Sequence, residues 1–98
     1  MLELPISSDA THFSQEHMVF GQHYLVEFEW IEREDYWVAH LYDASENPIA
    51  LGLRLMPNWP IFIDQKTGIT FLLLPKTSNA LLTAKSLRTD FMLVAYAV

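Results

Sequence analysis

The fold is decided by residues 24–42, whose sequence is YLVEFEWIEREDYWVAHLY. Over the first eight of these residues, apolar side chains recur at every second position, at Tyr24, Val26, Phe28 and Trp30. Two of the intervening residues are glutamates. Successive side chains of a strand point to opposite faces, so this pattern predicts a strand with one buried and one solvated face.

A second strand is predicted over Tyr36–Tyr42, after the polar turn Glu32–Asp35. Trp37, Ala39 and Leu41 are predicted to share one face of this strand, and Tyr36, Val38, His40 and Tyr42 the other. The two strands should form an antiparallel hairpin, with Trp30 and Trp37 near its closed end.

A third strand is predicted over Ile49–Met56, because alternation resumes after the turn Asp43–Pro48. Its apolar face is predicted to hold Ile49, Leu51, Leu53 and Leu55. The three strands together make a meander over residues 24–55, with one apolar face directed at the core.

Shorter apolar segments predict the remaining strands. They are Leu2–Ile6 at a sheet edge, a segment ending at Met18–Phe20, Ile61–Ile63, Ile69–Leu74, and Phe91–Val98 with both faces buried. Leu81–Leu87 fits either a strand or a short helix. Seven or eight strands with turns between them predict an all-β, mostly antiparallel, small barrel or sandwich. The length of 98 residues suits one β-rich domain, residues 1–98.

Charge is divided unequally along the chain. Residues 1–50 hold ten acidic side chains and one basic side chain, Arg33, for a net charge of −9. Residues 51–98 hold two acidic and five basic side chains, for a net charge of +3. Either the two regions are simply solvated, or they form a bipolar surface that docks against unlike neighbours. The few, dispersed basic residues disfavour nucleic-acid binding.

Composition and the N-terminal residues bound the class of protein. The chain has no cysteine, which excludes disulfides and thiolate metal sites. The first residues lack the basic and long apolar regions of a signal peptide. No apolar run approaches the roughly 20 residues of a membrane helix. We therefore expect neither a signal peptide nor a membrane span.

The residues that could carry chemistry are few. His12, His17, His23 and His40, with Glu16 and Glu27, could hold a metal, but their spacing matches no metal signature. Glu27 and Glu29 share a strand face at a separation that suits an acid–base pair, as in any amphipathic strand. Phosphate-binding and nucleophile motifs are absent, and only three glycines are present. We predict no enzyme activity, no cofactor, no bound metal and no small-molecule substrate.

Contact with other proteins is predicted for two places. Trp59 lies between Pro57 and Pro60, which prevent a regular ladder or helix, so its indole is either a contact anchor or a core plug. The edge strand predicted to contain Leu2, Leu4 and Ile6 could pair with a strand of a neighbour. Trp30 and Trp37 are predicted to lie in the core or hairpin.

The N-terminal half resembles the baseplate plug proteins of contractile-tailed phages, of the cyanophage type. The resemblance is carried by segments in a fixed order: Leu2–Ser7, Gly21–Tyr24 and the strand ending at Trp30, Tyr36–Trp37, Leu41–Asp43, Pro48–Ile49 and Gly52–Leu55. It implies a β-rich structural subunit of the virion, made in the host cytoplasm and placed at the baseplate hub near the end of the tail tube. Its implied partners are hub and tail-tube proteins and the tape measure, and it has no catalytic residues. We also expect a homo-oligomer in the assembly.

Two alternative functions follow from the aromatic residues and the histidines. A small ligand- or carbohydrate-binding β module would use exposed Trp and Tyr side chains, with Trp30, Trp37 and Trp59 as a stacking platform. A cupin-like metalloenzyme would require the four histidines to converge.

Overall fold

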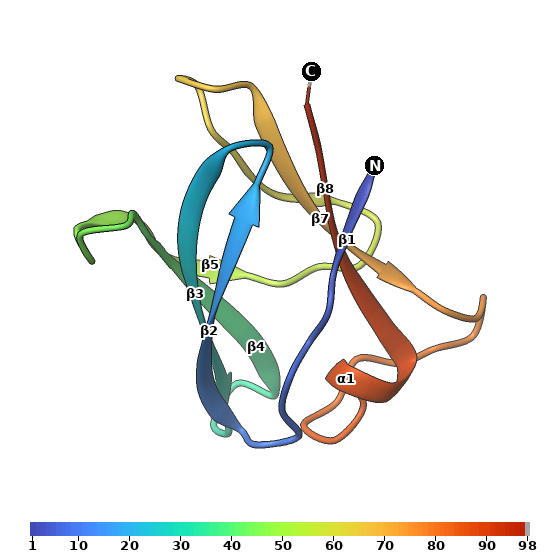
Figure 1. Cartoon of the computed structure of the whole chain (residues 1–98). Coiled ribbons are helices and arrows are strands. Elements are labelled where there is room, and N and C mark those ends of the chain that lie inside the picture. The colour runs from blue at the N-terminus through green and yellow to red at the C-terminus, as the bar shows by residue number, and fades with distance from the viewer. Residues whose placement is uncertain (98) are drawn as a thin grey trace.

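Two antiparallel sheets of four strands each pack face to face in the computed structural model, which describes residues 1–97 (Figure 1). One sheet has the order β2-β3-β4-β5 and the other the order β1-β8-β7-β6. The elements are β1 (Leu2–Leu4), β2 (His12–Val19), β3 (Gln22–Ile31), β4 (Tyr36–Tyr42), β5 (Pro48–Arg54), β6 (Pro60–Ile63), β7 (Ile69–Pro75), α1 (Leu87–Asp90) and β8 (Phe91–Ala97). The all-β prediction is confirmed, and the architecture is a sandwich rather than a closed barrel.

The meander is longer than the sequence indicated, because β2 precedes the three predicted strands and pairs with β3 along its whole length. Two of its inward residues, Gln15 and His17, are polar, so the apolar alternation indicated only the end of the strand, at Met18–Phe20. The predicted hairpin of β3 and β4 is confirmed. Trp30 stands opposite Trp37 near the turn, with their ring centroids 5.8 Å apart.

The core lies between the two sheets. The inward residues of β3 and β4 pack against those of β7 and β8, and the Tyr24 ring meets the Phe71 ring edge to face at 5.1 Å. Phe28 and Trp37 are among the largest fully buried side chains. Complete burial of one such aromatic side chain stabilises a fold by about 1.5–3 kcal/mol.

The predicted apolar face of the third strand is wrong at Ile49 and Leu51. Their side chains are 37% and 57% exposed, while Leu55 is buried. The reason is a β-bulge: Ala39 pairs with Leu53 but Leu41 pairs with Ala50, so the β5 strand contains an extra residue. That residue reverses the alternation, so that Ile49 and Leu51 are exposed and Ala50 between them is half-buried.

The bulge is built around Gly52. Its φ angle of +69° lies in the left-handed region, and its N–H donates a 2.9 Å hydrogen bond to Nδ1 of His40. A side chain other than glycine is strained at this φ, although the space around Gly52 is open.

Residues 81–86 form a loop, and only Leu87–Asp90 is helical, so neither prediction for Leu81–Leu87 describes the segment. The Ser86 hydroxyl donates to the Leu81 carbonyl at 2.7 Å and accepts from the Thr83 N–H at 2.8 Å. Side-chain hydrogen bonds of this kind compete with regular secondary structure.

Replacement of Gly52 by alanine is expected to destabilise the protein by about 1–2 kcal/mol, because alanine is strained at positive φ. Urea denaturation of the purified variant measures the change. Gly52→Asn is the matched control, since asparagine tolerates this conformation better and should cost less. Equal stability of the alanine variant and the parent would show that the bulge is not held in this conformation.

Candidate interaction surface

Trp59 stands on a short turn whose backbone is fixed while its indole is free. The Asn58 N–H donates a 2.9 Å hydrogen bond to the Leu73 carbonyl of β7, and the Trp59 N–H donates to the Met56 carbonyl at 3.2 Å. Asn58 adopts a φ of +70°, which closes the turn. The Trp59 side chain is 65% exposed, so the core-plug alternative is wrong.

A groove of about 290 Å³ lies beside this turn. It is lined by apolar and charged side chains together: Asp35, Tyr36, Arg54, Leu55, Met56, Pro57, Trp59 and Leu82. The Arg54 guanidinium stacks over the Tyr36 ring, 4.5 Å from the ring centroid. Sequence reasoning identified Trp59 but missed Arg54 and Tyr36, because they meet only when β4 and β5 pair.

The predicted edge strand is confirmed as β1, although it ends at Leu4 and leaves Ile6 outside it, and its sole hydrogen-bonded neighbour in residues 1–97 is β8. The side chains of Leu4 and Ile6 are 3% and 9% exposed and belong to the core, and Leu2 packs against it. A partner can therefore meet this segment through its backbone edge, not through the buried leucine and isoleucine side chains.

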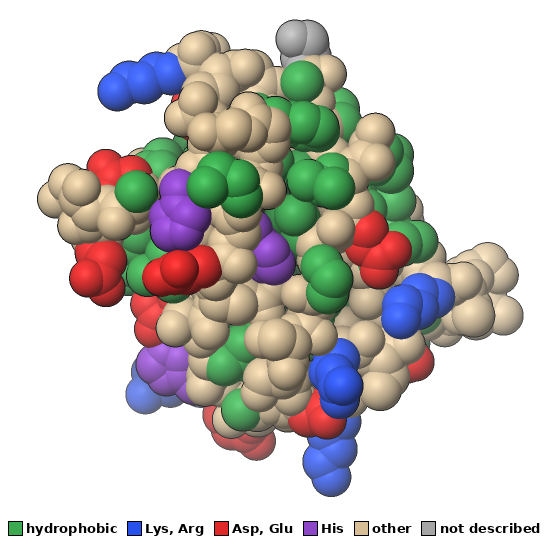
Figure 2. Space-filling view, in the orientation of Figure 1, with side chains coloured by type: hydrophobic (Ala, Val, Ile, Leu, Met, Phe, Trp, Pro, Cys, Tyr) green, Lys and Arg blue, Asp and Glu red, His purple; other side chains and the backbone are tan. Residues whose placement is uncertain are grey.

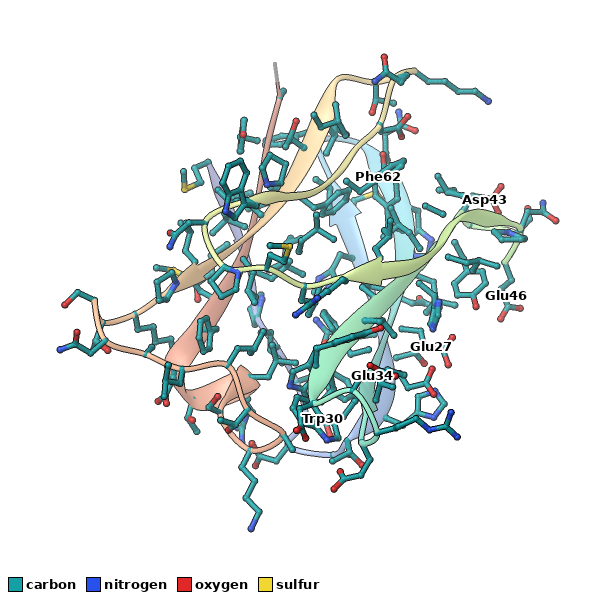
Figure 3. All side chains as sticks on the ribbon, turned by 180° about the vertical axis from the view of Figure 1, so that it is seen from behind. Glu27, Trp30, Glu34, Asp43, Glu46 and Phe62 are labelled. Carbon is teal, nitrogen blue, oxygen red and sulfur yellow. The ribbon has the colours of Figure 1, made fainter. Side chains whose placement is uncertain are left out.

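The acidic side chains gather on the meander. Figure 3 shows Glu27, Glu34, Asp43 and Glu46 on one side of the molecule, along β3 and β4 and the turns that flank them. In Figure 2, acidic and histidine side chains cluster at the side formed by β2–β5. Many acidic side chains of residues 1–50 therefore gather on one sheet, whereas Figure 2 shows Lys and Arg side chains on several sides of the molecule.

The histidines do not converge, and the part of the chain that the structure describes contains no group of three side chains able to hold a metal ion. Three of them face separate glutamates instead. His12 contacts Glu27, His23 lies 3.4 Å from Glu16, and His40 lies 3.3 Å from Glu29. The convergence that the metalloenzyme alternative requires is thus not found among residues 1–97.

Two of the histidines have pKa values shifted in opposite directions. The hydrogen bond to Glu27 raises the pKa of exposed His12 and lowers that of the Glu27 carboxyl. Burial lowers the pKa of His17. The Gln15 amide nitrogen contacts Nε2 of His17 while it also donates to the Pro5 carbonyl, so that Nε2 acts as an acceptor and the imidazole is neutral.

The three tryptophans do not form a shared stacking platform. Trp37 is 1% exposed, and its indole N–H donates a 2.8 Å hydrogen bond to the Thr83 carbonyl. Trp30 packs against Trp37, and its own N–H donates to Glu32 at 2.8 Å. Trp59 alone remains as an exposed indole, which suits one protein contact better than a sugar platform.

The described residues include no helix that is both long and apolar enough to cross a membrane. A sandwich with an anchored, exposed tryptophan, an open strand edge and a cluster of acidic side chains is typical of a protein that acts by contact with other proteins.

The chain belongs to the family described as cyanophage baseplate Pam3 plug gp18, which matches residues 1–97. It is therefore a structural component of the phage tail baseplate and is located in the virion. The resemblance inferred from the first half of the sequence is confirmed over nearly the whole chain. No curated protein matches the sequence.

Acidification is expected to destabilise the protein through His17. Its pKa is lower in the folded protein than in the unfolded chain, so the unfolded chain gains a proton first as the pH falls through its value of 6.5. The free energy of unfolding of a His17→Gln variant should therefore fall less than that of the parent between about pH 8 and pH 5.5. Urea denaturation across this pH range measures the difference.

His12→Gln is the control with the opposite sign. Because the pKa of His12 is raised, its contribution to stability is present at low pH and disappears as the pH rises. The His12→Gln variant should thus lose more stability on acidification than the parent. If both variants followed the parent curve, neither histidine would contribute to the pH dependence.

Proposed function

We propose that this protein closes the end of the tail tube as a plug held between the hub and tube proteins, where it also meets the tape measure. Membership of the plug family implies contact with other baseplate proteins. The finer assignment is supported by a surface that offers contact residues, among them the exposed Trp59. Its role is mechanical, and it requires no catalysis.

The observation that carries the proposal is the Trp59 turn. Hydrogen bonds fix its backbone to β7, and Pro57 and Pro60 restrict the chain on either side. An aromatic side chain presented in this way loses little conformational entropy when a partner covers it. Tryptophan is also the residue most enriched among the hot spots of protein interfaces.

Two further features support contact with several neighbours at once. The backbone edge of β1 offers a template for an added strand from a partner. The cluster of acidic side chains on the meander favours contact with a basic surface of a neighbour, including a further copy of this protein. We propose that the plug is present as a homo-oligomer in the assembled baseplate.

Trp59→Ala is expected to leave the isolated protein folded, with a change in the free energy of unfolding within about 0.5 kcal/mol, because the indole is exposed. Loss of a hot spot of about 2 kcal/mol would weaken the contact with the partner roughly thirtyfold. Electron microscopy of phage that carry the substitution would count particles with complete baseplates, which should be few.

Met18→Ala is the matched control, since Met18 is 63% exposed but lies on β2 and does not line the groove. Normal baseplates with Trp59→Ala, or a large loss of thermal stability in the isolated variant, would contradict the proposal. In the second case Trp59 would be needed for folding rather than for assembly.

A further inference from the structure

Arg54 is a cation held in place without a carboxylate partner. Its guanidinium lies 4.5 Å over the Tyr36 ring, on the outer side of the β4–β5 pair. None of the ion pairs within residues 1–97 includes Arg54, and its side chain is exposed. Stacking on an aromatic ring orients the planar group and leaves its N–H edges available for a bidentate acceptor.

The cation stands beside apolar surface. Arg54 lines the same groove as Met56, Trp59 and Leu82. Met56 is 48% exposed and Trp59 is 65% exposed, so both can be covered by a partner. The groove therefore offers the N–H groups of the Arg54 guanidinium to an anion and, next to them, an apolar surface to an apolar side chain.

We infer that this groove binds a segment of another baseplate protein that presents an Asp or Glu carboxylate next to an apolar side chain. The carboxylate pairs with Arg54, and the apolar side chain packs on Met56 and Trp59. The inference rests on the proposed plug function and adds the chemistry of the partner. Charge complementarity carries it, because the guanidinium is oriented before binding and lacks an internal counter-ion in the described residues.

Asp35 also lines the groove, so a partner segment with a cationic side chain is the alternative to one with a carboxylate. It lies in the β3–β4 turn with a φ of +56°, and its backbone N–H donates to the Ile31 carbonyl at 2.9 Å. No ion pair joins Asp35 to Arg54 among residues 1–97. A cationic partner segment would be recognised by Asp35, and the substitutions below separate the two cases.

The test is assembly of phage that encode Arg54→Glu, with Arg33→Glu as the matched control. Arg33 is exposed in the β3–β4 turn but does not line the groove. Reversal of the charge should weaken the contact about thirtyfold or more, so complete baseplates should be lost with Arg54→Glu and retained with Arg33→Glu. Arg54→Lys, which keeps the charge but not the fork, should give an intermediate yield.

Selection for restored plaque formation by the Arg54→Glu phage then identifies the partner. The expected suppressors replace an Asp or Glu of another baseplate protein by Lys or Arg. Suppressors of the same kind within this chain would show that a second copy fills the groove, and would overturn the assignment to a different protein.

The remaining outcomes separate this inference from the proposed function. Normal assembly with Arg54→Glu but defective assembly with Trp59→Ala would overturn the carboxylate partner and leave the plug contact standing. Defective assembly with Asp35→Lys and normal assembly with Arg54→Glu would show a cationic partner instead. Purified Arg54→Glu protein should melt near the parent temperature, because Arg54 is exposed. A large fall in its melting temperature would show that Arg54 acts in folding and would overturn its assignment as a partner contact.

Discussion

Burial of the Trp37 indole is the constraint on which the rest of the molecule depends. The indole lies inside the sandwich, contacts Phe13 and Trp30, and donates its N–H to the carbonyl of Thr83 in the irregular loop. The Trp37 carbonyl accepts the N–H of Leu55 where the chain leaves β5. One residue therefore joins the meander, the crossing to the second sheet and the loop before α1.

The orientation of this indole also determines what the outer surface presents. Since side chains alternate along β4, an inward Trp37 requires an outward Tyr36, and Arg54 of the neighbouring strand stacks on that ring. The same crossing brings the Trp59 turn to the rim of the groove. Neighbouring residues of β4 thus contribute to the core, through Trp37, and to the contact surface, through Tyr36.

Local alternation was sufficient to predict β3, its apolar face and its pairing with β4, because burial on one side of a strand places an apolar residue at every second position. The buried residues of β5 could not be predicted in this way, because the bulge depends on the register with β4. Gly52, at positive φ, is the one local sequence feature that indicates a bulge. The loop that contains Ser86 was missed because side-chain hydrogen bonds, not apolar spacing, define it.

The candidate site likewise has one part that local sequence predicts and one part that depends on how distant segments pack. The two prolines around Trp59 are local, so the sequence indicated an irregular segment and a free indole as one of two outcomes. The groove beside it combines residues from β4, β5 and the loop before α1. Sequence spacing could not predict it, because these segments come together only in the folded protein. The sequence likewise offered four histidines as possible metal ligands. In the structure, three of them instead contact separate glutamates.

Pairing of the first strand with the last has a mechanical consequence. β1 and β8 run antiparallel, with Leu2 opposite Ala95, so both ends of the described chain lie at the same side of one sheet (Figure 1). A pull on the two ends would peel β1 away and break its few hydrogen bonds one after another. Compression across the sandwich instead meets the whole packed core at once. A plug with this topology resists load that arrives through its surfaces far better than load that arrives through its termini.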